Sequence, residues 1–461
     1  MVSLGCPKNT VDGEVLLGDL WRRGYDVVDD HDASDVVLVN TCAFVEDARA
    51  ESVEAVVAAV ELKAAKEGKR VVVTGCMAQR HGAELADAVP EVDLVVGFER
   101  YGELGDALEV RRKKTSSTDT NDDRVRVGAA TVPFRPEGGR VRLGAPHTAY
   151  LRVAEGCSHA CTFCAIPGFR GKFRSKPWQD ALEEARGLVA AGAVELCLIA
   201  EDTNQYGLDR RHDDTSLAKL LAELRAELEP EGLRWIRILY AYPSYFDDAL
   251  VDEIARNPLV CKYLDLPLQH LSDPVLLAMN RPPRDHTERL LRALRDRIPG
   301  LALRTTFIAG FPGERPADHA EVVAFCREFG FERMGAFAYS EEDGTRAAAT
   351  AAEHPGLRVD EATRDARRDE LQALAQRMGE RFARSLVGST VDVLVDDGPD
   401  AEGVWVGRTQ WDAPDVDPCV LLREEEDDDP DRRRRPLRRG EIRRCLVDGT
   451  SVTDLFAHPV D

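Results

Sequence analysis

The sequence predicts an α/β protein with three folded parts: an N-terminal parallel α/β sheet domain, a central partial (β/α)6 barrel and a small C-terminal all-β barrel. Two blocks in which short apolar strands alternate with amphipathic helices indicate the two parallel sheets. A last block of short strands separated by turns indicates the β-barrel. The chain of 461 residues is long enough for about three domains, and its 43% hydrophobic and 31% charged residues are an ordinary globular balance.

The first block predicts the N-terminal sheet domain, which we expect to span residues 1–108. Short, entirely apolar strands are typical of a parallel sheet that is covered on both faces. The first strand begins almost at Met1, so whether Met1 is the native start stays open. The expected strands are Val2–Leu4, Val36–Val39, Val71–Val73 and Leu94–Val96, and the expected helices are Gly13–Arg23, Phe44–Lys66 and Ala78–Ala88.

The second block, residues 148–378, predicts the central barrel. A polar segment with Pro and Gly, residues 109–147, precedes it and is expected to be a linker. Six strand–helix units fit an incomplete barrel, in which the chemistry lies on loops after the carboxyl ends of the strands. The expected strands are Tyr150–Ala154, Glu195–Ile199, Trp235–Leu239, Tyr263–Leu266, Leu303–Ile308 and Met334–Phe337, with helices such as Trp178–Ala191 and Leu217–Leu228.

The last part of the chain, residues 379–461, predicts the small all-β barrel. A charged amphipathic helix over Asp360–Leu386 leads into it. An acidic run followed by four arginines, Glu424–Pro436, is expected to be a low-complexity loop without an assigned role. The expected strands are Thr390–Val395, Val404–Gly407, Cys419–Leu422 and Glu441–Val447.

Charge and apolar patterning restrict the partners of the chain. The net charge of −22 argues against a surface that wraps nucleic acid and favours a basic partner, although an acidic cytosolic surface explains it equally well. We find no run of 18 apolar residues and no signal-like N-terminus, so we expect a cytoplasmic protein with no membrane partner. The eleven cysteines are not spaced as in a small secreted scaffold, which favours metal ligation in a reducing compartment.

Three cysteines in AEGCSHACTFCAIPGFRG follow the first strand of the predicted barrel, and we call Cys157, Cys161 and Cys164 the loop cysteines. Three thiolates in one short loop suit an iron–sulfur cluster with one open iron, at which a substrate or cofactor can bind. A zinc site and a chance cluster are the alternatives. Zinc normally takes four ligands arranged as two pairs, and no matching pair follows.

Three further cysteines, Cys6, Cys42 and Cys76, each follow a strand of the first domain, and we call them the sheet cysteines. Loops after neighbouring parallel strands converge on one edge of the sheet, so these thiols are expected to gather and to suit a second cluster with an open iron. The alternative is three buried core cysteines. The other five have no partner spacing and are expected in the core or on the surface: Cys197, Cys261, Cys326, Cys419 and Cys445.

Taken in order, SLGCPKN, VNTC, VTGC, the loop cysteines, YLDLPLQH and FIAGFPGE resemble the methylthiotransferase family of radical S-adenosylmethionine enzymes over nearly the whole chain. The terminal barrel resembles the TRAM domain of that family. EGCSHACTFCAIPGFRGKFRSKP, EDTNQYG and YSEEDGT most resemble the members that methylthiolate the β-carbon of an aspartate in ribosomal protein S-twelve of the small subunit. The chain departs from the family at Glu201, where Gln is expected, at Glu341, where Pro is usual, and in the acidic–arginine insertion.

The resemblance implies two 4Fe–4S clusters, with S-adenosylmethionine as both radical source and methyl donor. The cluster on the loop cysteines would bind S-adenosylmethionine and cleave it with an electron from an external donor. The deoxyadenosyl radical would then take a hydrogen from the aspartate β-carbon. The cluster on the sheet cysteines would carry a sulfur from an external sulfur donor, which a second S-adenosylmethionine methylates. No residue beyond the cluster ligands is assigned a catalytic role.

Several barrel residues are expected to bind the cofactor. Phe163 can face the adenine, Ile308 can pack on it, and the turn after Ile308 lets the backbone approach a nucleoside, although an ordinary turn explains it as well. The expected cofactor-binding residues are Phe163, Ile166, Asp202, Ile308, Gly310, Pro312 and Gly313. Further candidates for the methionine moiety, the ribose or the substrate are Arg170, Arg174, Asp265, Gln269 and His270, of which His270 is more simply a structural histidine.

The substrate has two competing interpretations. Related enzymes methylthiolate an adenosine beside the tRNA anticodon, and a terminal domain that binds RNA should favour Lys and Arg. Residues 380–461 hold 20 acidic and 12 basic residues, a net charge of −8, which favours the basic S-twelve protein. The Arg432–Arg435 run keeps an RNA contact open. A third interpretation is a non-catalytic iron–sulfur sensor or ribosome-binding module.

Overall fold

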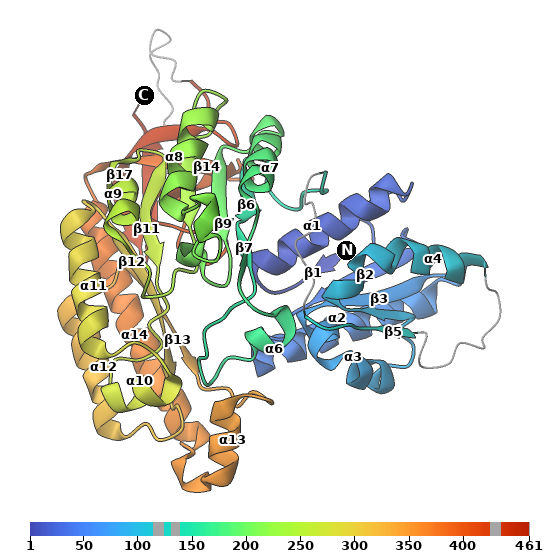
Figure 1. Ribbon diagram of the computed structural model, residues 1–461. Helices are drawn as coiled ribbons and strands as arrows, with labels where there is room; N and C mark the ends of the chain where they lie inside the picture. Colours follow the sequence, from blue (N-terminus) through green and yellow to red (C-terminus); the bar gives the residue numbers. More distant parts are fainter. Residues whose placement is uncertain (114–123, 131–138, 425–434, 461) are drawn as a thin grey trace. The chain divides into compact units, whose positions relative to one another are not determined.

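The computed structural model describes residues 1–113, 124–130, 139–424 and 435–460 (Figure 1). These residues form two compact units. The first unit consists of residues 1–144, 155–159 and 164–176, and the second of residues 145–154, 160–163 and 177–461. The first unit therefore holds the predicted N-terminal sheet, and the second holds both the central and the terminal barrel. None of the described helices is long and apolar enough to cross a membrane.

The first unit is built on a five-stranded parallel sheet in the order β1-β2-β3-β4-β5 (Figure 1). Its strands are β1 (Val2–Ser3), β2 (Val36–Thr41), β3 (Arg70–Gly75), β4 (Leu94–Val96) and β5 (Val125–Arg126). Its helices are α1 (Pro7–Arg22), α2 (Glu46–Ala65), α3 (Cys76–Ala88), α4 (Leu104–Lys113), which continues the 3₁₀ helix η1 (Phe98–Glu103), and α6 (Ile166–Arg170).

Both faces of this sheet are covered, as its apolar strands predict. Alternate residues of one strand go to opposite faces. Val71 and Val73 of β3 pack in a core with α2 and α3, whereas Val72 packs in a second core with α1 and α4. The sequence predicts α1 only from Gly13, but the helix begins at Pro7, because Cys6 is its N-cap and proline suits the first helical position.

The described part of the predicted linker lies mostly in the first unit, while residues 145–147 belong to the second. Lys113 ends α4, and β5 adds a parallel strand to β4. Farther along, Val141 N–H donates to the Glu14 carbonyl oxygen at 3.1 Å, and Arg140 forms an ion pair with the Glu14 carboxylate at 3.2 Å. Most of the polar KKTSSTDTNDDR segment lies outside the described residues. The described residues of this segment up to Gly144 therefore contribute to the first unit.

The second unit contains a six-stranded parallel sheet in the order β13-β12-β11-β10-β9-β6, which confirms the partial barrel. Its strands are β6 (Thr148–Arg152), β9 (Glu195–Ile199), β10 (Trp235–Ile238), β11 (Val260–Asp265), β12 (Ala302–Ala309) and β13 (Arg333–Ala338). The predicted first strand ends at Ala154, but β6 ends at Arg152, and a separate two-stranded sheet pairs β7 (Ala154–Glu155) with β8 (Arg174–Ser175).

The helices of the second unit connect these strands and flank the loops that follow them (Figure 1). Short polar side chains begin four of them. Ser216, Asp247, Thr345 and Asp360 each accept a hydrogen bond from a backbone N–H of the first turn. The helices are α7 (Trp178–Ala190), α8 (Leu217–Leu228), α9 (Asp248–Arg256), α10 (Asp273–Met279), α11 (Arg284–Arg297), α12 (Pro316–Phe329), α13 (Arg346–Glu353) and α14 (Glu361–Leu386) with the 3₁₀ helices η2 (Thr203–Gln205), η3 (Arg211–Asp213) and η4 (Pro355–Leu357).

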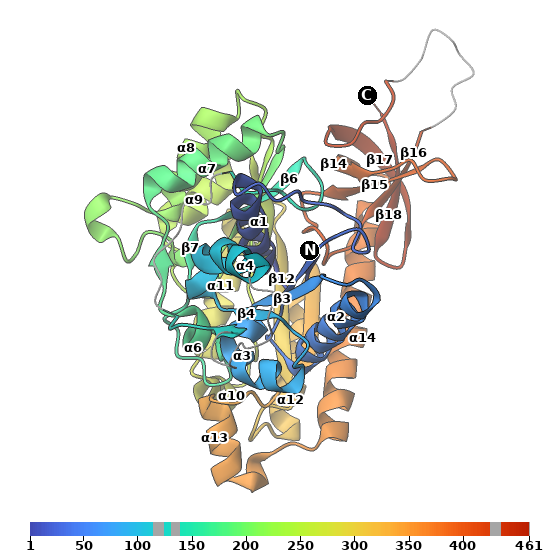
Figure 2. The same ribbon diagram turned by 90° about the vertical axis from the view of Figure 1, so that its right-hand side faces the viewer.

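The terminal part closes into a five-stranded barrel in the order β14-β15-β16-β18-β17, which Figure 2 shows at the end of α14. Its strands are β14 (Thr390–Asp397), β15 (Val404–Thr409), β16 (Val420–Arg423), β17 (Ile442–Ser451) and β18 (Asp454–Pro459). The sequence predicts four of them and misses β18, which closes the barrel between β16 and β17. Residues 425–434 of the acidic–arginine loop lie outside the described residues.

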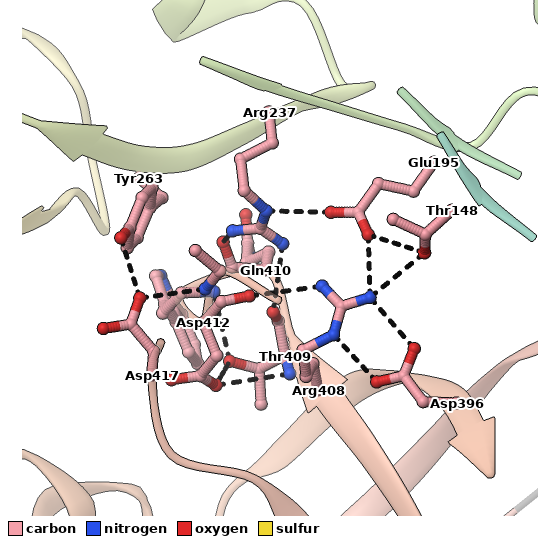
Figure 3. A network of polar contacts seen from close by, with 12 residues as sticks. Thr148, Glu195, Arg237, Tyr263, Asp396, Arg408, Thr409, Gln410, Asp412 and Asp417 are labelled. Atoms are coloured by element: carbon pink, nitrogen blue, oxygen red, sulfur yellow. Dashed lines mark hydrogen bonds and ion pairs between the residues drawn. The ribbon is translucent and has the colours of Figure 1, made fainter. Parts of the chain in front are cut away.

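A buried polar network joins the small barrel to the amino ends of the central strands (Figure 3). Glu195, the first residue of β9, accepts from Arg237 Nε and from Arg408 Nη2, both at 2.8 Å. Tyr263 O–H donates to Asp417 at 2.7 Å, and Arg333, the first residue of β13, pairs with Asp412. The small barrel is therefore fixed at the end of the strands that is opposite to the carboxyl-end loops.

Candidate functional site

The sheet cysteines follow three neighbouring strands, as predicted. Cys6 lies after β1 and caps α1, with its carbonyl oxygen accepting from the N–H groups of Asn9 at 2.8 Å and Thr10 at 3.1 Å. Cys42 follows β2, and its N–H donates to Ser52 Oγ at 2.9 Å. Cys76 is the first residue of α3, directly after β3. The order β1-β2-β3 thus brings the three residues to one edge of the sheet.

Two glycines let the backbone turn tightly at this edge. Gly5 has φ +87°, and a Cβ there would lie 2.9 Å from Cys42 Sγ. Gly75 has φ +91°, and a Cβ there would lie 2.4 Å from the Thr41 carbonyl oxygen. Both positions need a positive φ and also leave no room for a side chain, so only glycine fits them. With any residue other than glycine at positions 5 and 75, the turns before Cys6 and Cys76 could not approach the end of β2 so closely.

Asn9 connects all three turns, and the sequence analysis did not assign it. Its Nδ2 donates to the carbonyl oxygens of Leu4 at 2.8 Å and Thr41 at 2.9 Å. Its Oδ1 lies 3.8 Å from Cys76 Sγ, within reach of the thiol. Asn9 is 1% exposed, so water does not compete for these contacts. The only sequence signal for it was its place in the SLGCPKN motif, three residues after Cys6.

The thiols of the sheet cysteines influence one another electrostatically. Burial raises the pKa of Cys42, and the charge of Cys6 adds to this increase. Burial also raises the pKa of Cys76 to about 12; Arg170 opposes this increase, while Cys6 and Cys42 add to it. Thiolates are the form that binds metal, so a bound ion would have to replace these protons. Among the described residues, no three Cys, His, Asp or Glu side chains form a ready metal site, so the ligand roles stay a prediction.

The loop cysteines lie in a segment that both units share. In the first unit, Cys157 N–H donates to the Gly171 carbonyl oxygen at 3.0 Å, and Ser158 Oγ accepts from Phe173 N–H at 3.1 Å. These bonds fix one flank of the loop to the residues that follow Cys164.

In the second unit, residues 160–163 are held by the ends of two helices. Thr162 N–H donates to the Met279 carbonyl oxygen at 3.1 Å, at the end of α10. The Thr162 carbonyl oxygen accepts from Ala347 N–H at 2.9 Å, in the first turn of α13. Asn280 Nδ2 donates to the Ala160 carbonyl oxygen at 3.1 Å. The backbone on both sides of Cys161 is thus anchored within one unit.

Arg281 is a second residue that the sequence analysis missed. Its Nη1 lies 3.8 Å from Cys161 Sγ, and its guanidinium lies 4.1 Å from the centroid of the Tyr242 ring. Its Nη2 donates to the Pro267 carbonyl oxygen. A cation held against an aromatic face thus lies beside Cys161. No spacing in the sequence connects Arg281 with the loop cysteines, which precede it by more than a hundred residues.

The predicted cofactor-binding residues Phe163 and Ile308 lie against one apolar cluster of the second unit. Both are partly buried and pack against a core that includes Phe311 and Tyr339, whose rings meet edge to face at 5.3 Å. Gly310 and Gly313 have φ +77° and +86°, so the turn after β12 has the backbone conformation that glycine favours. Pro312 is buried between them. These residues form a single apolar surface at the carboxyl end of β12.

Glu314, which was not predicted from the sequence, binds the backbone of this turn. Its carboxylate accepts from the N–H groups of Gly310 and Phe311 and pairs with Arg367 at 3.1 Å. His270 Nε2 lies 3.9 Å from the same carboxylate, and His270 Nδ1 accepts from a backbone N–H. Burial alone raises the pKa of Glu314. The interaction with the nearby His270 ring and the charge of Arg367 outweigh burial and bring this pKa below its ordinary value. His270 thus has the structural surroundings expected of it.

The remaining candidates have mixed surroundings. Asp202 is fully buried after β9 and accepts from Tyr242 N–H at 3.3 Å. Asp265 pairs with Arg304 at 3.0 Å, beside the network that holds the small barrel. Gln269 has φ +72° and bridges to β12 through its backbone. Three candidates, Ile166, Arg170 and Arg174, lie in the first unit. Ile166 packs against its core, and Arg174 donates to the Arg170 carbonyl oxygen at 3.4 Å. Their binding roles stay predictions.

Comparison with known proteins identifies the family. Residues 1–97 match the model of uncharacterized protein family UPF0004, residues 151–326 the radical SAM superfamily and residues 387–460 the TRAM domain. The ribosomal protein uS12 methylthiotransferase RimO of Anaeromyxobacter sp. (strain Fw109-5) is 43% identical over 90% of this chain and 85% of its own. RimO of Citrifermentans bemidjiense is 40% identical over 100% of this chain and 98% of its own. The chain belongs to the RimO family.

A solved structure supports the fold of this RimO-family chain. The radical S-adenosylmethionine methyltransferase TsrM from Kitasatospora setae has a TM-score of 0.55 at 17% identity and covers 77% of this chain and 75% of its own. The resemblance stated from the motifs is confirmed, and with it the fold class and a sulfur-group transferase of the radical S-adenosylmethionine type. S-adenosylmethionine and iron–sulfur clusters are the cofactors of this family, while the assignment of individual cysteines to each cluster stays a prediction.

Proposed function

We propose that this chain is a radical S-adenosylmethionine methylthiotransferase that replaces one β-hydrogen of an aspartate in ribosomal protein S-twelve by a methylthio group. The observation that carries the proposal is the 43% identity to a RimO over 90% of the chain. The reaction takes place in the cytoplasm and needs an external electron donor and an external sulfur donor. The net charge of −22 suits a basic protein substrate.

In this proposal each cysteine trio holds one 4Fe–4S cluster and leaves one iron open. The bound clusters supply reductive cleavage of S-adenosylmethionine and delivery of sulfur. The chain itself supplies the ligands and their placement: Asn9 ties the three strand ends that carry the sheet cysteines, and Arg281 places a positive charge beside Cys161. Gly5 and Gly75 let a bulky inorganic group approach the backbone.

The apolar surface of Phe163 and Ile308 would receive the nucleoside of S-adenosylmethionine. An adenine needs flat apolar contact and a close backbone, and the surface beside the Gly310 turn offers both. Asp202 is a buried carboxylate, and it would accept hydrogen bonds from the ammonium or from a ribose hydroxyl of S-adenosylmethionine. Exclusion of water by this apolar surface would protect a reactive radical from side reactions.

Iron content tests the two-cluster part of the proposal. Anaerobically reconstituted protein should hold about eight irons per chain, as two 4Fe–4S clusters require. Cys76→Ala and Cys161→Ala should each hold about four, because each removes one ligand of a different cluster. Cys419→Ala is the matched control, since Cys419 lies half-buried in the small barrel, and it should keep the full content. Full iron in Cys76→Ala would contradict the ligand assignment.

Substrate competition tests the choice of substrate. The reconstituted protein is incubated with methyl-labelled S-adenosylmethionine and reductant, once with S-twelve protein or small subunits and once with tRNA. Label in an aspartate-containing peptide of S-twelve is the expected result. Methylthioadenosine in tRNA with an unlabelled S-twelve would establish the competing function, which the arginine run of the terminal loop kept open.

Cofactor cleavage separates an enzyme from an iron–sulfur sensor. A sensor would assemble its clusters yet release no 5′-deoxyadenosine when dithionite and S-adenosylmethionine are added. We expect 5′-deoxyadenosine from the wild-type chain and none from Cys161→Ala. Product from neither protein, with about eight irons bound in the wild type, would favour the sensor.

A further inference from the structure

Arg170 ends α6 six residues after Cys164, and its guanidinium lies in the core of the first unit. Its side chain is only 3% exposed. The sequence analysis grouped it with side chains that bind the cofactor or substrate, but the structure gives it other partners. Its Nη2 donates to Asp12 Oδ2 at 2.9 Å, and its Nη1 donates to Glu155 Oε1 at 2.8 Å.

The same guanidinium contacts a cysteine of the other trio. Nη2 of Arg170 lies 3.5 Å from Cys76 Sγ, a hydrogen bond to sulfur. The guanidinium carbon lies 4.4 Å from the centroid of the Phe98 ring, which covers one of its faces. A planar group with fixed donors can satisfy two carboxylates and one sulfur at once, which the single ammonium of lysine cannot reproduce.

The partners of Arg170 come from segments that carry or flank cluster cysteines. Asp12 lies on α1, which begins next to Cys6. Glu155 lies two residues before Cys157, and Cys76 begins α3. All these residues belong to the first unit. A single buried cation thus connects the surroundings of the sheet cysteines with both flanks of the loop that carries Cys157 and Cys164.

We propose that Arg170 is a positioning residue that holds the Cys76 ligand and raises the reduction potential of the cluster on the sheet cysteines. This inference rests on the proposed function, because it requires a cluster at that site. Reduction adds negative charge to the cluster, and hydrogen bonds to its sulfurs stabilise that charge. A buried N–H donor on a cationic group does so more strongly than a neutral donor in water.

The sign of the effect follows from the charges around Cys76. Removal of the Arg170 cation and its hydrogen bond disfavours the reduced cluster, so the potential falls. Removal of the Asp12 carboxylate, which lies 2.9 Å from the guanidinium, takes away a negative charge, so the potential rises. Opposite shifts from two neighbouring substitutions distinguish an electrostatic effect from a general loosening of the fold.

The test isolates one cluster. In a parent protein with Cys157, Cys161 and Cys164 all replaced by alanine, only the sheet cysteines can hold a cluster. Electron paramagnetic resonance during an anaerobic redox titration then reports its potential. Arg140→Gln is the matched control, because Arg140 is also a 3%-exposed arginine side chain of the first unit and pairs with Glu14 at 3.2 Å.

We expect Arg170→Gln to lower the ratio of reduced to oxidised cluster about tenfold at a fixed potential, a shift of about 59 mV for one electron. Arg170→Lys keeps the charge without the planar fork, so it should shift the potential in the same direction by less. It also keeps the inference testable if the glutamine variant does not fold. Asp12→Asn should shift the potential upward, and Arg140→Gln should leave it unchanged.

The outcomes separate this inference from the proposed function. A parent protein without any cluster would contradict the proposed function. A parent cluster whose potential is the same in Arg170→Gln, Arg170→Lys and Arg140→Gln would overturn the role of Arg170 and leave the proposed function standing. A downward shift in Asp12→Asn would overturn the electrostatic explanation as well.

Discussion

The structure predicts that Glu195→Gln will loosen the attachment of the small barrel. Glu195 is completely buried at the start of β9 and bridges Arg237 and Arg408, both at 2.8 Å (Figure 3). Arg408 keeps Asp396 as a second carboxylate partner, while the other recorded partners of Arg237 are the carbonyl oxygens of Gln410 and Thr409. Removal of the Glu195 charge therefore leaves the Arg237 cation buried without a carboxylate.

The magnitude follows from the pKa of Glu195. Burial alone raises this pKa, but the charges of Arg408 and Arg237 bring it to about 2, compared with an ordinary value of 4.5. That difference corresponds to about 3 kcal/mol of folding free energy. The contribution is fully present above pH 4.5 and is lost as the pH falls toward 2, because the carboxylate of the unfolded chain takes up its proton first.

Hydrogen exchange measured by mass spectrometry reports local opening without requiring the whole chain to unfold in one step. The backbone of β9 and β15, as reported by the peptides that cover these strands, should open about a hundredfold more often in Glu195→Gln at pH 7. This factor corresponds to about 3 kcal/mol. Glu227→Gln is the control. Glu227 pairs with Arg186 in a two-pronged contact at 2.8 Å, but on the surface, where such pairs contribute less than about 1 kcal/mol.

Two results would refute this reasoning. Equal exchange in the Glu195 and Glu227 variants would mean that the buried pair contributes no more than a surface pair. If protection at β9 and β15 in the wild type, corrected for the intrinsic exchange rate at each pH, stays constant from pH 6 to pH 3, the Glu195 carboxylate is not stabilised by its arginines. In the Glu195→Gln variant the same pH range should have a smaller effect, because the titrating group is gone.

Three further substitutions test the backbone of the two units. Gly75→Ala should lower the free energy of unfolding of the first unit by about 2 kcal/mol or more, in thermal melts, because it combines φ +91° with a contact at 2.4 Å to a carbonyl oxygen. Gly310→Ala should weaken S-adenosylmethionine binding at least about tenfold in equilibrium dialysis, since its Cβ would displace Arg364, whereas Gly330→Ala, with φ +69° and open space, should not. Thr345→Ala should cost about 1 kcal/mol by loss of the α13 cap, seen as faster exchange at Ala348; unchanged exchange would contradict this role.

The fold could be predicted to a large extent because its strongest signals are local. Short apolar strands and amphipathic helices located nearly every element of both parallel sheets. The elements that were missed have weak local signals. The first turn of α1 is polar, and Lys8 and Asn9 are buried only because tertiary contacts receive them. The two-residue strand β5 exists through pairing with β4, and β18 pairs with the neighbouring β17 and also with β16, which lies about thirty residues earlier.

In the candidate site, too, the residues that could be predicted are those with a local signal in the sequence. The six cysteines could be predicted because their spacing, or their place after a strand, carries the chemistry. Asn9 and Arg281 were not assigned, because each acts on a cysteine or a strand end that is distant in sequence. Glu314 lies in the FIAGFPGE motif and binds its nearby turn, but its pairing with Arg367 depends on the fold. Arg170 was predicted to bind the methionine moiety, the ribose or the substrate, and that role stays a prediction, but no pattern in the sequence indicated the partners that the structure gives it. Its carboxylate and thiol partners come from three separate segments, which only the folded first unit brings together.

The charge of the terminal barrel needs a structural correction before it supports a protein substrate. Its net charge of −8 counts Asp396, Asp412 and Asp417, yet Asp412 and Asp417 have side chains that are only 3% exposed and all three contact groups of the network in Figure 3. Asp412 and Asp417 pair with Arg333 and Arg304 of the central barrel, and Asp396 pairs with Arg408 of the small barrel and with His147, so these charges are neutralised within the second unit. The surface that remains is less acidic than the count suggests, although acidic residues still outnumber basic ones.

The small barrel is also attached at the amino ends of the central strands, and the eight residues of β12 alone span about 26 Å. If the proposed function holds and the chemistry takes place at the carboxyl-end loops, the charge of the small barrel would act far from the reacting carbon and would favour a basic partner without selecting the aspartate itself.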